Sequence, residues 1–402
     1  KWQGDCWREN KMREYYDLAR RLNREALVWP GASDLSRGAR TRLGSATTAN
    51  GMIYYVKADP RIASETESWD ANLWYLGVPG GVIDLQSCQM VQPERQHLIT
   101  KQTAVAPENG PHPEWDKFLE RVCDYDLQLI AYLRRYGGYC LTGETREHAF
   151  AFLYGTGANG KTTLIQTLLS IFGGYGVTTG METFAESHND RHPTEIARLR
   201  GARLVATEET ATGARWNEGR IKRLTGGGKI AARFMRQDEF EFEPRFKLLI
   251  AGNHKPALRA DEAMKRRVHL VPFTVTIPEA ERDQHLFEKL KAEWPQILAW
   301  LLDGCAEWRE HGLQPPPRVL EATAKYIESN DVLLAWIEER VEQTGWGDGR
   351  SLHADFVKWC DAEGEKPWSR RAWSIAMEDR GYSPKRKLSG GVLMRWFDGA
   401  TL

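Results

Sequence analysis

Three features are scarce in this sequence of 402 residues, and each absence excludes a class of protein. The six cysteines form no Cys-x-x-Cys pair, which argues against a zinc ribbon or a disulfide framework and fits a reducing cytoplasm. No apolar run reaches membrane length and no signal peptide is present, so we expect no membrane partner. Net charge is also absent, because 55 Lys and Arg balance 55 Asp and Glu, so any nucleic-acid-binding surface must be local.

One glycine-rich stretch stands between a strand pattern and a helix pattern. Residues 148–154 have the composition of a strand, and apolar residues recur at helical spacing over 164–172. The stretch between them matches Gly-x-x-x-x-Gly-Lys-Thr, a loop whose backbone N–H groups and helix N-terminus surround phosphate. Lys161 is predicted to reach the β- and γ-phosphates of ATP, and the Thr162 hydroxyl to bind Mg²⁺. The predicted nucleotide-binding residues are Gly155, Thr156, Gly157, Ala158, Asn159, Gly160, Lys161, Thr162 and Thr163.

The same stretch allows a second interpretation. It also spells Gly-x-Gly-x-x-Gly, a dinucleotide signature, and Glu182 follows at about the distance of a ribose-binding carboxylate. That interpretation leaves Lys161 and Thr162 without a role, and the later part of the chain favours a nucleoside triphosphate.

Polar residues that follow two later strand patterns complete a candidate hydrolytic site. Glu208 and Glu209 end an apolar run about 45 residues after Lys161, and we assign Glu208 to Mg²⁺ through water and Glu209 to the base. Asn253 ends the next strand pattern and is predicted to contact the γ-phosphate and position water. Two exposed glutamates at a strand end, or an ordinary turn asparagine, are the simpler alternatives.

The chain divides into four predicted units. The first is mostly helical, with a helix from Trp2 to about Asn23 and two short strands around a Pro-Gly-Gly turn at 79–81. The second alternates strands and helices, which implies an α/β core with a mainly parallel sheet. The third is helical, and the last gives helix, helix and hairpin, the pattern of a winged helix. These units are residues 1–145, 146–278, 279–349 and 350–402.

Basic residues in two segments are candidate contacts to DNA phosphates. Alternating polar and apolar residues predict a β-hairpin over 229–246, with basic side chains toward its base and tip. The last unit is locally basic, although a solvated face is nearly as good an explanation. The candidate DNA-binding residues are Lys229, Arg233, Arg236, Arg370, Arg371, Lys385, Arg386 and Lys387.

The order of these motifs resembles that of superfamily 3 helicases. The resemblance is greatest to the satellite-phage type of primase-helicase, found in phages and plasmids, and to the poxvirus primase-helicase. The resemblance covers nearly the whole chain. It rests on the loop at 155–163, the Glu208–Glu209 strand, the segment Lys222–Gly227, the hairpin, the segment Ile250–Pro256, and Arg266–Arg267 before the strand that ends at Phe273.

The resemblance implies an AAA+-like P-loop ATPase core, with an N-terminal helical module and a C-terminal winged helix. It implies a ring, expected to be a hexamer, in which Arg266 or Arg267 (Arg267 being preferred) enters the neighbouring subunit's site. The implied function is an ATP-dependent DNA helicase that moves 3′ to 5′ on single-stranded or forked DNA, with a primase in cis or in trans. It would replicate a phage or mobile element in a bacterial cytoplasm. Two alternatives stay open: an ATP-dependent DNA loader or remodeller without processive unwinding, and a P-loop kinase or defence NTPase.

Overall fold

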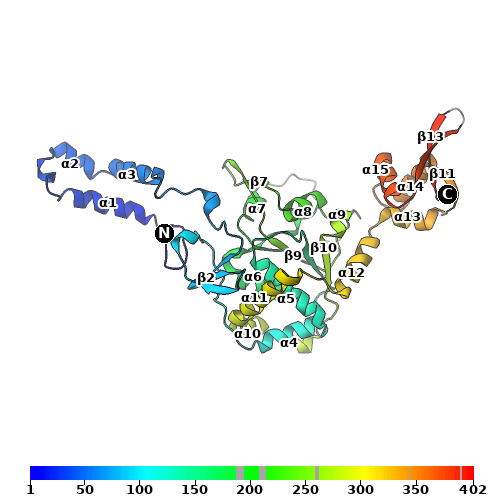
Figure 1. The fold of residues 1–402 in the computed structure, drawn as a ribbon, viewed down its shortest axis with the longest axis horizontal. Helices are drawn as coiled ribbons and strands as arrows, with labels where there is room; N and C mark the ends of the chain where they lie inside the picture. Colours follow the sequence, from blue (N-terminus) through cyan, green and yellow to red (C-terminus); the bar gives the residue numbers. More distant parts are fainter. Residues whose placement is uncertain (187–193, 208–213, 259–261, 343, 390–391) are drawn as a thin grey trace.

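A parallel sheet of five strands forms the centre of the chain (Figure 1). The computed structural model describes residues 1–402 except 187–193, 208–213, 259–261, 343 and 390–391. The side chains of residues 387–393 are also outside the description. In spatial order the strands are β10 (Val268–Pro272), β4 (Phe150–Tyr154), β9 (Lys247–Gly252), β6 (Leu204–Thr207) and β5 (Gly176–Thr178). Strand β4, which comes first in the chain, thus lies between β9 and β10, which come last. This arrangement is consistent with a P-loop ATPase core. The predicted α/β core is confirmed.

Both faces of this sheet are buried, as in other parallel sheets that helices cover on two sides. Ala151 and Leu153 of β4 point into one core, whereas Phe150 and Phe152 point into the other. The first core lies under α4 (Pro113–Val122), α5 (Leu127–Leu141), α6 (Lys161–Phe172), α10 (Leu286–Ala292) and α11 (Trp294–His311). The second lies under α7 (Thr194–Ala197), α8 (Glu218–Thr225), α9 (Glu262–Lys265) and α12 (Pro317–Glu328).

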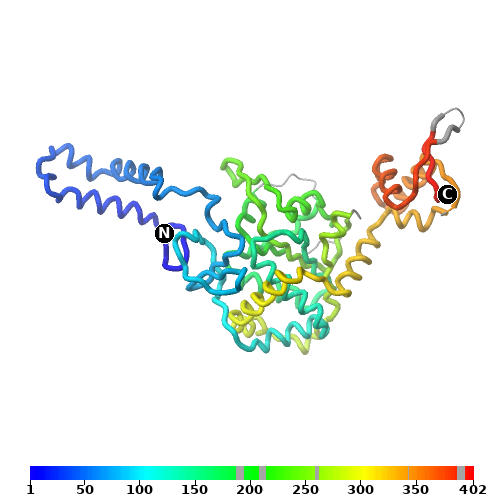
Figure 2. The backbone as a smooth tube through the Cα atoms, in the orientation of Figure 1, coloured from blue at the N-terminus to red at the C-terminus, as the bar shows by residue number. Residues whose placement is uncertain are grey.

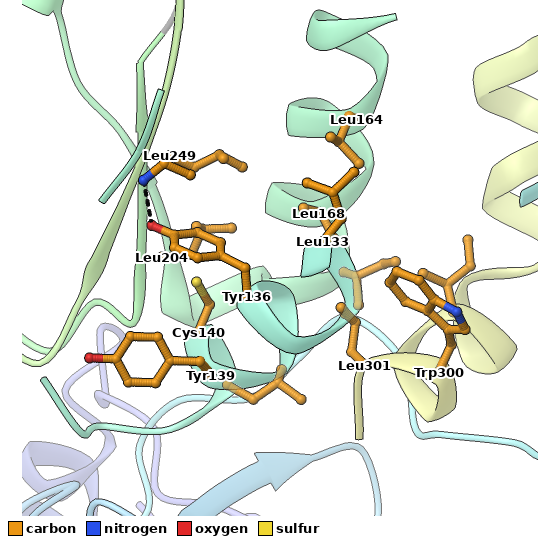
Figure 3. Close-up of a cluster of buried hydrophobic side chains, with 14 of the residues drawn as sticks. Leu133, Tyr136, Tyr139, Cys140, Leu164, Leu168, Leu204, Leu249, Trp300 and Leu301 are labelled. Atoms are coloured by element: carbon orange, nitrogen blue, oxygen red, sulfur yellow. Dashed lines mark hydrogen bonds between the residues drawn. The ribbon is translucent and has the colours of Figure 1, made fainter. Parts of the chain in front are cut away.

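Helix α5 connects the first core to the sheet (Figure 3). The Tyr136 hydroxyl donates to the Leu248 carbonyl at 2.6 Å and accepts from the Ala151 N–H at 3.0 Å, so it bonds to two adjacent strands. On the opposite side α5 packs closely on α11. An added Cβ on Gly138 would lie 2.1 Å from the Cys305 nitrogen.

That close packing corrects one expectation from the sequence. Gly137 and Gly138 look like a helix break, yet α5 continues through both and ends at Leu141. These glycines let two helix backbones approach, and the buried contact outweighs their low helix propensity. The real break lies earlier, where Asp124 and Tyr125 adopt φ of 60° and 58° between α4 and α5.

The N-terminal region combines a helical arm with a small antiparallel sheet. The arm contains α1 (Glu14–Ala26), α2 (Arg37–Leu43) and α3 (Ala46–Ala58), and the sheet contains β1 (Tyr75–Val78), β2 (Gly81–Asp84) and β3 (Gln89–Val91). The two strands around the Pro-Gly-Gly turn are confirmed. The helix expected from Trp2 begins only at Glu14, because the preceding residues pack against the sheet and the segment after it. Cys6 is buried with Val82 of β2, and the Trp7 N–H donates to the Ile99 carbonyl.

The C-terminal unit has its own core and lies on the side of the central body opposite the arm (Figure 2). Its elements are α13 (Val332–Arg340), β11 (Trp346–Asp348), α14 (Gly349–Glu363), α15 (Arg370–Asp379), β12 (Pro384–Ser389) and β13 (Val392–Asp398). The expected two helices and hairpin are present. The sequence placed α13 with the preceding helices, but its Leu333 and Trp336 are buried in this core.

None of the helices in the described ranges combines the length and the apolar character that a membrane span requires.

Candidate nucleotide-binding site

The glycine-rich loop joins β4 to the N-terminus of α6, as the sequence predicts. Gly157 and Gly160 adopt φ of 106° and 82°, values that residues with a Cβ rarely reach. The loop and the segment Ala251–Asn253 line a cleft of about 350 Å³. That volume is in the range of small-ligand sites, and the first N–H groups of α6 have no helical acceptor, so the cleft suits a phosphate group.

Lys161 is the first residue of α6, and its side chain folds back into the loop. Its Nζ donates to the Gly155 carbonyl at 2.7 Å, to Asn159 Oδ1 at 2.8 Å and to Asn253 Oδ1 at 3.1 Å. The residue is only 6% exposed, and burial lowers the pKa of its ammonium group to about 8. All three acceptors are neutral oxygens, so an anion in the cleft would meet a cation that no carboxylate among the described residues contacts.

Hydrogen bonds to the segment that follows β10 fix the shape of the loop. Asn159 Nδ2 donates to the Phe273 carbonyl at 3.1 Å, and the Ile277 N–H donates to the Ala158 carbonyl at 2.7 Å. Gly155 must remain a glycine, because a Cβ there would lie 2.1 Å from the Phe273 oxygen. The sequence motif placed Asn159 in the loop but gave no sign that it bonds to Phe273, the residue that follows β10. Its side-chain amide, which can donate and accept at once, was the available signal.

Asn253 joins Lys161 in the site, as expected for residues that follow neighbouring parallel strands. It comes directly after β9, whose last residue pairs with Tyr154 at the end of β4. Thr162 is exposed beside the cleft, where its hydroxyl could bind a metal ion that accompanies phosphate. Glu208 and Glu209 follow β6 in sequence and lie outside the described residues.

The strand order argues against the dinucleotide alternative. In a dinucleotide-binding sheet, the strand before the ribose-binding acid lies beside the strand before the glycine-rich loop. Here β5, which precedes Glu182, is separated from β4 by β9 and β6. Glu182 therefore follows a strand at the far edge of the sheet.

Arg266 and Arg267 precede β10, so they lie at the amino ends of the parallel strands. The nucleotide cleft lies at the carboxyl ends. Since β10 runs parallel to β4, the length of a five-residue strand, roughly 17 Å, separates these arginines from the cleft. Arg267 bonds within its own chain, to the Thr225 hydroxyl at 3.2 Å and the Ala263 carbonyl at 2.8 Å. Arg266 is exposed, and its Nε donates to the Glu262 carbonyl at 3.3 Å. Neither guanidinium can reach the cleft of its own chain.

The predicted β-hairpin is present as β7 (Ile230–Arg233) and β8 (Glu239–Phe242), at the upper side of the central body in Figure 1. Ile230 and Ala232 are buried, so the alternating side chains of this strand, including that of Arg233, face solvent. Lys229 and Arg236 are also exposed, and Arg236 adopts φ of 61° at the tip. These three cations are thus accessible and separate from the nucleotide cleft.

The basic residues of the C-terminal unit are also accessible. Arg370 and Arg371 begin α15 and are exposed, as are Lys385 and Arg386 on β12. Lys385 Nζ lies 5.0 Å from the ring centre of Trp346. The side chain of Lys387 lies outside the described part of the chain.

Comparisons with known proteins match two regions of the chain to protein families. Residues 1–124 match the family described as "D5 N terminal like", and residues 153–267 match a family of unknown function, DUF5906. "Putative helicase L207/L206" of Acanthamoeba polyphaga mimivirus is 26% identical over 351 residues, which cover 79% of this chain and 36% of that protein. "Putative helicase 022R" of Frog virus 3 is 29% identical over 226 residues, covering 50% of this chain and 23% of that protein.

A third relative carries a primase name. "Putative primase C962R" of African swine fever virus is 21% identical over 227 residues, covering 54% of this chain and 23% of that protein. The chain spans about a quarter to a third of the length of these three relatives. Among solved structures, the apo NrS-1 C-terminal region aligns with 88% of this chain and 90% of that one, at 12% identity and a TM-score of 0.47.

Proposed function

We propose that this chain is an ATP-dependent DNA helicase of superfamily 3 that acts in the replication of a phage or another mobile element. The matches to the D5 N-terminal-like and DUF5906 families, and the relatives named as putative helicases and a putative primase, support this proposal. The observation that carries this proposal is the contact between Lys161 and Asn253 beside a cleft of small-ligand size. It brings a P-loop cation and a neutral amide from a second strand to the place where the γ-phosphate of ATP would lie.

In the proposed reaction, Lys161 turns from its neutral acceptors to the β- and γ-phosphates. Asn253, released from Lys161, positions the attacking water together with Glu209. The Thr162 hydroxyl, and Glu208 through water, are the proposed Mg²⁺ partners. Bound Mg²⁺ would neutralise charge on the phosphates.

The position of the arginine pair supports assembly into a ring. Because Arg266 and Arg267 lie at the sheet edge away from their own cleft, an arginine of this pair can act only on the nucleotide of a neighbouring copy. Repeated contacts of that kind close into a ring when the rotation permits, and we propose a hexamer. The sequence favours Arg267, but the geometry favours Arg266, because it is exposed whereas Arg267 bonds to Thr225 and Ala263.

Two surfaces are proposed to bind DNA. Single-stranded DNA would contact Lys229, Arg233 and Arg236 of the hairpin through its phosphates, without dependence on sequence. The C-terminal unit, whose order of helix, strand, two helices and two strands fits a winged helix, would bind duplex near the fork through Arg370, Arg371, Lys385, Arg386 and Lys387. By family resemblance, movement is 3′ to 5′, and a primase acts in cis or in trans.

A strand-displacement assay tests the proposal. The wild-type chain should release a labelled strand from a forked duplex when ATP and Mg²⁺ are present, and Lys161→Ala should not. Forks with a single 3′ or 5′ tail report the direction of movement. ATP hydrolysis and DNA binding by the wild type with no strand release would favour the alternative function, an ATP-dependent DNA loader or remodeller.

A further inference from the structure

Cys88 differs from the other five cysteines, all of which lie in the described part of the chain. It is partly exposed, whereas Cys6, Cys123, Cys140, Cys305 and Cys360 are buried. It lies in the turn between β2 and β3 with a φ of 56°, a left-handed conformation uncommon for a residue with a side chain. Solvent can therefore reach this thiol at a turn.

The Cys88 thiol lies against one face of α11. It donates to the Leu302 carbonyl at 3.7 Å and to the Leu85 carbonyl at 3.8 Å. Leu302, Cys305 and Arg309 are spaced at i, i+3 and i+7, so they share this helix face. The Arg309 guanidinium donates to the same Leu85 carbonyl at 3.3 Å. A second thiol and a permanent cation thus flank the partly exposed Cys88.

These neighbours favour the thiolate form of Cys88. A hydrogen bond from the Cys305 thiol is the main cause that lowers the pKa of Cys88 to about 7, and the charge of Arg309 acts in the same direction. The same hydrogen bond and burial raise the pKa of Cys305 well above its ordinary value. By contrast, burial raises the pKa of Cys123 to about 12. The pair therefore combines a partly exposed nucleophile with a second thiol that lies close enough to hydrogen-bond to it.

We propose that Cys88 and Cys305 form a peroxide-reactive dithiol, a modification site that oxidises to a reversible disulfide between the β2–β3 turn and α11. The Cys88 thiolate attacks one oxygen of hydrogen peroxide, the O–O bond breaks, and the hydroxide that leaves is protonated to water. The Cys305 sulfur then attacks the Cys88 sulfenic acid. The S–S bond forms, the S–O bond breaks, and the leaving hydroxide takes up the Cys305 proton as a second water. Two thiols are oxidised and one peroxide is reduced to two waters.

Intact-mass and peptide-mapping measurements on the full chain test this site. Equimolar peroxide at neutral pH should lower the wild-type mass by about 2 Da, with the link mapping to Cys88 and Cys305, and dithiothreitol should reverse the change. Cys305→Ser should retain the first step only, giving a sulfenic acid at Cys88 that dimedone traps. Cys88→Ser should abolish the mass loss.

Cys123→Ser is the matched control, since it removes a buried thiol of raised pKa, and it should behave as the wild type does. A link that maps to other cysteines would overturn the proposal. So would a wild-type protein that stays reduced, or one in which Cys88 stops at the sulfenic acid without a link to Cys305. The test does not depend on ATP or DNA, so it remains valid if the proposed helicase activity fails.

Discussion

The low pKa of Lys161 predicts that ATP binding depends on pH in the alkaline range. In the free protein the pKa of Lys161 is about 8, because the side chain is buried among neutral oxygens. Phosphates placed beside the same group favour its charged form and raise that pKa. Binding above pH 8 must therefore add a proton to Lys161, and the affinity must fall as the pH rises.

The size of the effect follows from the two protonation states. With a pKa of about 8, Lys161 is about 90% charged at pH 7 and about 10% charged at pH 9 in the free protein. If the nucleotide keeps Lys161 charged throughout this range, the affinity is nearly constant below pH 7 and falls about tenfold between pH 7 and pH 9.

Equilibrium titration with a fluorescent ATP analogue at saturating Mg²⁺ and constant ionic strength measures this change. Lys161→Met serves as the control, because it removes the titrating group and its weaker binding should stay flat over the same range. A wild-type affinity that is equal at pH 7 and pH 9 would refute the reasoning, as would an equal fall in the Met variant.

Three further predictions concern other parts of the chain. Gly155→Ala should abolish ATP binding, because its Cβ would meet the Phe273 carbonyl at 2.1 Å, whereas Gly228→Ala, where a Cβ meets nothing within 4 Å, should bind normally in the same titration. Arg266→Ala should retain ATP binding and assembly but lose about 10³-fold or more of the hydrolysis rate in a coupled ATPase assay, and normal turnover would exclude it as the arginine acting between subunits. Removal of residues 332–402, a unit with its own core, should weaken duplex binding in fluorescence anisotropy while ATP binding persists. Unchanged duplex affinity would contradict the proposed role of that unit.

The local motif and the apolar runs separated by helix patterns predicted the central sheet and the position of the glycine-rich loop. Both depend on short-range patterns, such as the strand–loop–helix sequence around Lys161. The features that were not predicted depend on contacts between distant segments. Gly138 continues a helix because it faces α11, and residues before Glu14 are not helical because they bond to a segment about 90 residues later, where the Trp7 N–H meets the Ile99 carbonyl. No local pattern records such contacts.

The same limit applies to the candidate site. The sequence identified Lys161 and Asn253, because each follows a strand that a pattern can reveal. It could not show that Arg266 and Arg267 lie beyond the reach of their own cleft, because that fact follows from strand direction and order. Nor could it reveal the bond from Asn159 to Phe273, which joins residues 114 positions apart.

Strand β10 has one further consequence. At its amino end it carries the arginines proposed to contact a neighbour's nucleotide, and its Phe273 carbonyl, just after its carboxyl end, holds Asn159 and thereby the loop around its own nucleotide. The strand pairs with β4 along its whole length, so one continuous ladder of hydrogen bonds links its two ends. In a ring of such chains, a displacement at one nucleotide would be passed through β10 to the next.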